Sequence, residues 1–129
     1  MIVVDSSALI DSFMDIEHAR VFSELMKTES LAAPSHIYVE TMHSLRKLER
    51  EDAISTIFGE QCVALLGNLP INRYATHDML WESWSLRHNI TAYDAPYVIL
   101  AGILDATLLT HDRRLAKAAQ FQVKTMRLD

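Results

Sequence analysis

The sequence is poor in the residues that cross-link, break or hinge a chain. It contains one cysteine, Cys62, among 129 residues, so an internal disulfide framework is excluded and the thiol is expected to fill the core. It has only three glycines and three prolines, and no linker, repeat or low-complexity tract. We therefore predict a single domain over residues 1–129, long enough to bury a real core.

Long apolar runs and an excess of basic charge are also missing. The longest apolar run, Ala95 to Leu104, falls short of a membrane span, and no basic region followed by an apolar stretch begins the chain. A cytoplasmic protein without membrane contact is expected. The net charge of −5 argues against a broad basic face for nucleic acid. It remains compatible with a hydrolase that gathers carboxylates around metal ions.

Short apolar runs alternate with segments of helical periodicity. The runs predict strands at residues 1–4, 31–33, 69–71, 106–109 and 123–126. The periodic segments predict helices near residues 8–13, 18–27, 35–48, 52–67, 76–88, 91–104 and 113–119. Ser6 or Ser7 is expected to cap the first helix and Ser35 the third, with Trp84 buried on the fifth. This alternation predicts an α/β fold with a mostly parallel sheet.

Four acidic residues follow or flank the predicted strands. Asp5 follows the first strand directly, and Asp112 comes shortly after the LLT strand end. Glu40 lies early in the helix after the second strand, and Asp94 lies in the first turn of the most apolar helix. Residues after the ends of parallel strands gather along one edge of the sheet. We therefore expect these four acids to meet in one cleft.

Each acid alone also has an ordinary explanation. Asp94 completes a capping box with Thr91, Asp112 is a plausible N-cap, and Glu40 resembles a solvated helix residue, whereas Asp5 is the least explained. Four clustered carboxylates would raise one another's pKa values unless a cation lies between them. Mg²⁺ and Mn²⁺ prefer such hard oxygen ligands, so the set predicts a divalent metal site.

Four segments carry a resemblance to a known family: IVVDSSALI, PSHIYVETMHSL, ITAYDAPYVILA and LLTHDRRLAKAA. In this order they resemble the PIN domain, in particular the VapC-type toxins of bacterial toxin–antitoxin pairs. The resemblance implies a Rossmann-like three-layer α/β/α sandwich and a Mg²⁺- or Mn²⁺-dependent endoribonuclease. It further implies a homodimer and a cognate antitoxin protein that occludes the acidic cleft.

The resemblance also assigns residues. The family's acidic quartet, taken as catalytic residues and metal ligands, corresponds to Asp5, Glu40, Asp94 and Asp112. Thr110 matches the family's hydroxyl residue near the last acid, and Ser6 matches its small polar residue after the first acid. Both are expected to fix the orientation of the metal-binding carboxylates. Pro96 is less usual at its position and is expected to alter the start of its helix.

The expected reaction is hydrolysis of an RNA phosphodiester by metal-activated water. Asp5 and Asp94 are the first choices for metal ligands, with Glu40 and Asp112 completing the site or orienting the water. Ordinary solvated helix faces and RNA phosphate contacts are equally good explanations of the basic residues that follow the acids: Arg46, Lys47, Arg50, Arg113 and Arg114.

Three other classes compete with the nuclease. A phosphorelay receiver domain needs an acid after its middle strand, where LPIN has none. A haloacid-dehalogenase-like phosphatase needs D-x-D, and Ser7 occupies the second acidic position. A catalytically silent PIN-like module that only binds protein stays open, although the complete quartet counts against it.

Overall fold

A five-stranded parallel sheet forms the centre of the computed structural model, which describes all 129 residues. Every pairing is parallel, and the strand order is β3-β2-β1-β4-β5. The strands are β1 (Ile2–Val4), β2 (Leu31–Pro34), β3 (Ile71–Tyr74), β4 (Thr107–Leu109) and β5 (Thr125–Met126). The predicted parallel sheet is confirmed. The third strand begins later than expected because Pro70, which lacks an N–H, stays outside it.

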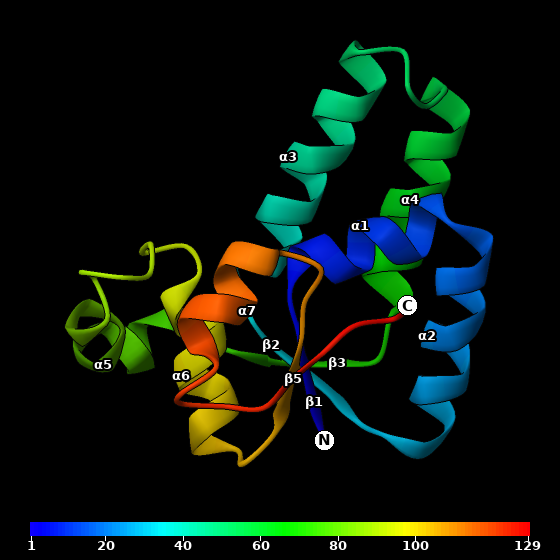
Figure 1. Ribbon diagram of the computed structural model, residues 1–129. Helices are drawn as coiled ribbons and strands as arrows, with labels where there is room; N and C mark the ends of the chain where they lie inside the picture. Colours follow the sequence, from blue (N-terminus) through cyan, green and yellow to red (C-terminus); the bar gives the residue numbers. More distant parts are fainter.

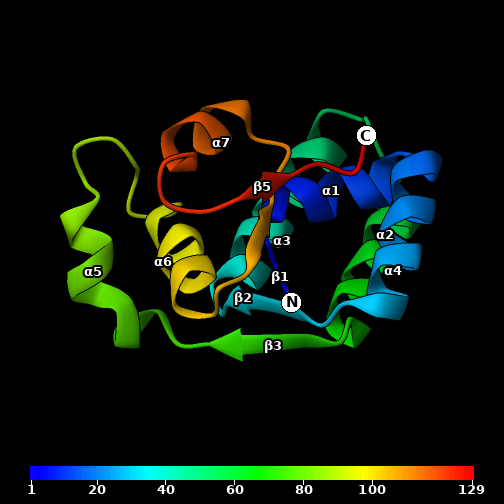
Figure 2. The same ribbon diagram turned by 60° about the horizontal axis from the view of Figure 1, so that its bottom comes forward.

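Helices cover both faces of this sheet, as the predicted α/β/α sandwich requires. In Figure 2, α5, α6 and α7 lie on one side of the central strands and α1, α2 and α4 on the other. Figure 1 shows α3 and α4 projecting beyond the sheet as a pair. The helices are α1 (Ser6–Met14), α2 (Ile16–Thr28), α3 (Ile37–Arg50), α4 (Thr56–Asn68), α5 (Leu80–Ser85), α6 (Ala95–Ile103) and α7 (Arg113–Ala119), with a 3₁₀ helix, η1, at Thr76–Met79.

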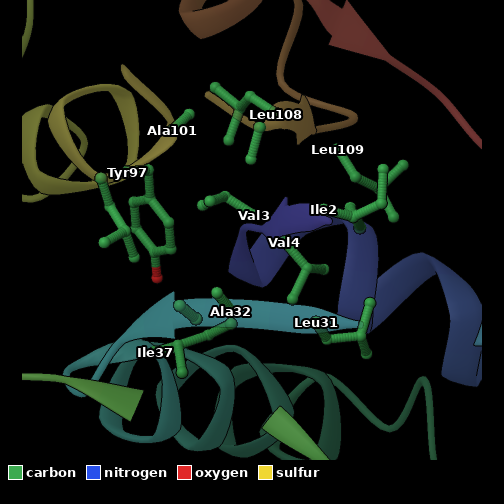
Figure 3. Close-up of a cluster of buried hydrophobic side chains, with 14 of the residues drawn as sticks. Ile2, Val3, Val4, Leu31, Ala32, Ile37, Tyr97, Ala101, Leu108 and Leu109 are labelled. Carbon is green, nitrogen blue, oxygen red and sulfur yellow. The ribbon is translucent and has the colours of Figure 1, made fainter. Parts of the chain in front are cut away.

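The core is built on the two central strands. All of β1 is buried, and its register places Val3 opposite Leu108 of β4 and Val4 opposite Leu109. Helix α6 is almost entirely apolar and packs on β1, β2 and β4, which accounts for its burial. Figure 3 shows Tyr97 of α6 reaching toward β1 and β2 within this cluster. Cys62 is buried, as expected.

The segment from residue 76 to 88 differs most from the sequence-based expectation. It forms the short η1 and α5 followed by turns instead of one long helix. Met79 is buried, but Trp84 is 60% exposed, so its predicted burial is wrong, and Trp81 is 81% exposed. Helical spacing of apolar side chains shows that one face favours a partner, but not that the same chain supplies one. Helix α5 lies at the periphery of the domain (Figure 1).

Several helix starts also differ from expectation. Helix α4 begins after the cap Ser55, because Asp52 adopts a positive φ of 55° in the preceding turn. Two apolar residues of this helix, Ile57 and Val63, are exposed. Asp5 caps α1 in place of Ser6 or Ser7. The N-cap residue of α3 is His36, which makes no side-chain capping bond, so Ser35 is not the predicted cap of this helix. None of the helices has both the length and the apolar character that a membrane crossing requires.

Candidate active site

The acidic residues lie along the edge where the parallel strands end. Asp5 follows β1 directly, and Asp112 lies three residues after the end of β4. Glu40 is in the first turn of α3, the helix that follows β2. Asp94 occupies the cap position of α6. Parallel strands place all their carboxyl ends at one edge, so the topology brings these four segments to the same side of the sheet.

Asp5 is the most tightly held of the four acids. Its side chain is almost completely buried, and Oδ1 accepts hydrogen bonds from Ser7 Oγ at 2.6 Å and from the Ala8 backbone N–H at 3.1 Å. Oδ2 accepts one from Thr110 Oγ1 at 2.6 Å. The cap of α1 and the end of β4, more than a hundred residues apart, therefore fix both carboxylate oxygens.

The loop after β4 is part of the same network. Ser7 Oγ accepts the His111 backbone N–H at 2.9 Å, and Thr110 Oγ1 accepts the Asp112 N–H at 3.0 Å. Asp112 in turn caps α7, where its Oδ1 accepts the N–H groups of the second and third helical residues. Its expected capping role is confirmed. We name this network the strand corner: Asp5, Ser7, Thr110, His111 and Asp112.

A second group joins the starts of α3 and α6. Tyr97 Oη donates to Glu40 Oε1 at 2.6 Å, and His36 Nε2 lies 3.4 Å from the same oxygen. His36 Nε2 also lies 2.8 Å from the Tyr93 carbonyl oxygen, which can only accept, so that nitrogen carries a proton. We name this group the helix corner: His36, Glu40, Asp94 and Tyr97.

Asp94 connects the two corners electrostatically. Its negative charge raises the pKa of Asp5 and of Glu40, in each case as a smaller contribution than burial. The pKa of Asp94 is itself raised, first by burial and then by the charge of Asp112. Asp94 therefore lies close enough to each of the other three carboxylates for their charges to repel. Pro96 lies in the first turn of α6, where an N–H has no partner within the helix, so it does not disturb the helix start.

Burial has its largest effect on Asp5. It raises the pKa of this carboxyl from 3.8 to about 6, although three hydrogen bonds to the ionised form oppose the shift. Burial and the bond to Glu40 raise the pKa of the Tyr97 hydroxyl far above its usual range, so it remains a donor at any working pH. The ionised cluster thus carries an unfavourable excess of negative charge that a cation would relieve.

The donor set fits a hard divalent cation. None of the ion pairs in the structure includes Asp5, Asp94 or Asp112, so no arginine or lysine neutralises these three acids. No three of the four carboxylates bring ligand oxygens within 4.8 Å of one another. In this arrangement a single ion has at most two of them as direct ligands. Mg²⁺ is commonly held in this way, with water completing its coordination.

A different trio satisfies that distance criterion: Asp11, His18 and His111 have ligand atoms within 4.8 Å of one another, which makes a metal site there possible. The ring of His111, however, already uses both nitrogens. Nε2 accepts the Leu128 backbone N–H at 3.0 Å, so Nδ1 carries the proton and donates to Asp11 Oδ2 at 2.6 Å. Arg127 also donates to the His111 carbonyl oxygen at 3.2 Å. In this structure His111 ties the C-terminal residues to the strand corner.

Sequence reasoning missed four residues that contact the acids or their loops: Ser7, His36, Tyr97 and His111. Ser6, the predicted support of Asp5, makes no side-chain hydrogen bond, and the hydroxyl beside Asp5 belongs to Ser7. The sequence signal for Tyr97 was its place three residues after Asp94, in the first turn of the helix that Asp94 precedes. His111 gave no spacing signal, since its partners come from distant segments.

The basic residues divide between two locations. Arg114 lines the same hollow as Asp94 and Asp112, whereas Arg113 is exposed on the first turn of α7. The other three lie farther along α3, on the part that projects away from the sheet in Figure 1: Arg46, Lys47 and Arg50. Of the five residues predicted to bind phosphate, only Arg114 is placed directly beside the acids.

Comparison with known proteins gives consistent results. A family model described as PIN domain matches residues 2–120. The chain is 43% identical over 121 residues to ribonuclease VapC1 of Mycobacterium tuberculosis, covering 90% of this chain and 89% of that protein. It is 34% identical over 122 residues to ribonuclease VapC9 of the same species, covering 95% and 94%. The crystal structure of VapBC2 from Rickettsia felis, bound to a promoter DNA fragment, superposes with a TM-score of 0.72 at 13% identity, covering 100% of both chains.

Proposed function

This chain belongs to the PIN domain family, and on that premise we propose that it is a Mg²⁺-dependent endoribonuclease, the toxin of a toxin–antitoxin pair. Relatives that cover nearly all of its length are named ribonucleases. The observation that carries the proposal is the group of four carboxylates at the strand ends, three of which have no cationic partner in the protein. Mn²⁺ is expected to substitute for Mg²⁺ because it prefers the same oxygen ligands.

Asp5 and Asp94 would be the first choices for direct ligands of the cation, and Glu40 and Asp112 would complete the site through bound water or orient that water. A divalent cation supplies Lewis acidity there: it makes water a better nucleophile near neutral pH and stabilises charge on the phosphate. Ser7 and Thr110 keep Asp5 in one orientation by donating to its two oxygens. Tyr97 does the same for Glu40 and leaves Oε2 free to accept a proton or orient water.

Glu40 is the best-placed proton acceptor in the chain. Its carboxylate is 22% exposed, and its pKa is raised by burial and by Asp94, which makes it a stronger base than an ordinary surface acid. Arg114 is the nearest predicted partner for a substrate phosphate, since it shares a hollow with two of the acids. These roles require an RNA strand whose scissile phosphate lies between the two corners.

The direct test incubates purified protein, freed of any bound partner, with total cellular RNA in Mg²⁺ or in EDTA and maps the new RNA ends. Discrete cleavage sites that require Mg²⁺ and disappear with Asp94→Asn support the proposal. Mg²⁺ binding without cleavage by protein that is demonstrably folded would contradict it and favour the catalytically silent binding module.

We also propose the partners that the family resemblance implies, namely a homodimer in the cytoplasm and an antitoxin protein that covers the acidic edge. The exposed apolar side chains of the α3–α4 pair and of α5 support protein contacts, among them Val39, Met42, Trp81 and Trp84. Light scattering of the purified chain tests the dimer. Co-purification with the product of a small neighbouring reading frame, followed by loss of RNA cleavage, tests the antitoxin.

A further inference from the structure

A hollow of about 160 Å³ opens beside two of the acids. Asp94 and Asp112 form part of its wall, together with the side chains of Asn89 and Arg114. The wall combines residues from the segment before α6 with residues of α7, which are separate in sequence. A nucleic-acid strand that reaches the acidic edge from this side must pass along α7.

The hollow continues into two wider ones. The next, of about 560 Å³, shares Asn89, Arg114 and Ala118 with the first and adds Lys117, Gln120 and Phe121. A third, of about 500 Å³, shares Gln120 and Phe121 with the second and reaches Lys124. The lining of these two wider hollows contains no acid, although the whole chain has a net charge of −5. Neighbouring hollows that share lining residues thus lead from the acids past three cations, Arg114, Lys117 and Lys124.

Phe121 stands where the second and third hollows meet. Its side chain is 90% exposed, the highest value among the large apolar side chains that lie on the surface. It follows α7 in the turn before β5 and contributes nothing to the core. A single exposed apolar residue is ordinary, so the weight rests on its position between Lys117 and Lys124.

Resting on the proposed ribonuclease function, we propose that this path is an RNA-binding groove. It is defined by Asn89, Arg114, Lys117, Phe121 and Lys124. The three cations contact phosphates on one side of the scissile bond, and the ring of Phe121 stacks on an unpaired base. Cations that track a backbone, with an aromatic ring between them, match what single-stranded nucleic acid requires.

Single-stranded RNA fits this groove better than a duplex. A fully exposed ring needs a free base face, whereas the bases of a duplex are already stacked on one another. Asn89 has an amide that donates and accepts, so it is suited to the edge of a splayed-out base. A protein partner fits less well because three cations flank the one aromatic ring, and the only other apolar residues that line the two wider hollows are Ala118 and Val123.

The test compares Phe121→Ala, Phe121→Trp and the double variant Lys117→Gln/Lys124→Gln with the wild type. Ile16→Ala is the matched control, because Ile16 is also an almost fully exposed apolar residue but lies on α2. The probes are an unstructured, fluorescein-labelled 12-nucleotide RNA and the corresponding 12-base-pair duplex. Fluorescence anisotropy, in an Asp94→Asn background that prevents cleavage, reports binding. Steady-state cleavage in Mg²⁺ with Asp94 intact reports kcat and KM.

Phe121→Ala is expected to weaken binding of the single strand roughly tenfold and to raise KM by a similar factor at nearly constant kcat. Phe121→Trp should restore binding, and the duplex should show no response to either variant. The double lysine variant should flatten the dependence of log K on log salt by about 0.7 for each phosphate that a lysine no longer neutralises. Ile16→Ala should match the wild type in every measurement.

Wild-type affinity in Phe121→Ala, together with normal cleavage, would overturn the groove and leave the ribonuclease proposal intact. Loss of self-association or of antitoxin binding, with unchanged RNA affinity, would also overturn it and would assign the surface to a protein. Conversely, single-strand binding that responds to Phe121 but is never followed by Mg²⁺-dependent cleavage supports the groove and refutes the proposed activity.

Discussion

The two corners of the acidic edge are built differently. In the strand corner, Asp5 is 3% exposed, and both its oxygens accept short bonds from hydroxyls that belong to different segments. In the helix corner, Glu40 is 22% exposed and receives one short bond, from Tyr97, while Asp94 is only partly buried. One corner holds its carboxylate in a fixed position, and the other leaves its carboxylates room to move.

The difference follows from the supporting elements. Strands β1 and β4 are hydrogen-bonded neighbours in the sheet, so the residues just beyond them have little freedom. Helices α3 and α6 are joined at their first turns by the side-chain bond from Tyr97 to Glu40. If the site binds a cation as proposed, the strand corner would offer it a carboxylate in a fixed orientation, and the helix corner would offer carboxylates with fewer partners in the protein.

The largest expected effect comes from removing one acid of each corner. Asp5→Asn and Asp94→Asn should each lower the Mg²⁺-dependent rate of RNA cleavage by more than roughly 100-fold, because loss of a supporting residue alone commonly costs 10 to 100-fold. Initial rates at saturating Mg²⁺ measure the effect, and Asp78→Asn, an exposed acid of η1, is the control. Full activity in either acid variant would remove that corner from the site.

The next effect concerns the buried charge of Asp5. Its pKa is raised from 3.8 to about 6, so the folded protein binds a proton more tightly than the unfolded chain does. Stability from this group is therefore fully present below pH 3.8 and is lost as the pH rises through 6. In EDTA, the free energy of unfolding should fall by about 3 kcal/mol more in the wild type than in Asp5→Asn between pH 3.5 and 7.5.

Urea titrations at several pH values measure this difference. Added Mg²⁺ should offset the loss at high pH in the wild type and have less effect on Asp5→Asn. The same variant made at Asp94 should show a smaller difference, because Asp94 is only about half-buried. Equal differences for both variants would contradict the contrast between the corners.

A third prediction compares two threonines. Thr110→Val removes a donor to Asp5 and the acceptor of the Asp112 N–H at a buried position, and it should destabilise the fold by about 2 kcal/mol. Thr91→Val removes an exposed hydroxyl that accepts the Asp94 N–H and lowers the pKa of the Asp94 carboxyl, and it should cost about 0.5 kcal/mol. Thermal and urea unfolding of both variants measure the two losses of stability. Similar losses would show that the two corners hold their acids equally firmly.

The smallest effect is expected for Tyr97→Phe. The ring stays packed, while Glu40 loses the hydrogen bond that lowers its pKa, so its pKa should rise further. The acid limb of the pH profile for RNA cleavage should therefore move to higher pH, with a stability loss of about 1 kcal/mol. An unchanged profile would show that Tyr97 is only a packing residue.

Much of the fold was predictable because it depends on local pattern. The five apolar runs predicted the five strands, and the segment from Arg113 to Ala119 was predicted as a helix with the bounds observed. Capping of that helix by Asp112 was equally readable, since the cap and the N–H groups that it accepts are close in sequence. The prediction for the segment around Trp81 and Trp84 failed because periodicity does not reveal whether the same chain supplies a surface for the apolar face to pack on.

The sequence by itself determined where Asp5 and Asp112 stand, because an acid placed after a parallel strand must reach the ligand-binding edge. Only the tertiary structure decided which hydroxyl supports Asp5, why His111 is buried and how far the pKa of Asp5 rises. The bonds from Thr110 to Asp5 and between His111 and Asp11 join residues about a hundred positions apart, and the pKa shift arises from exclusion of water, so neither is encoded in local spacing.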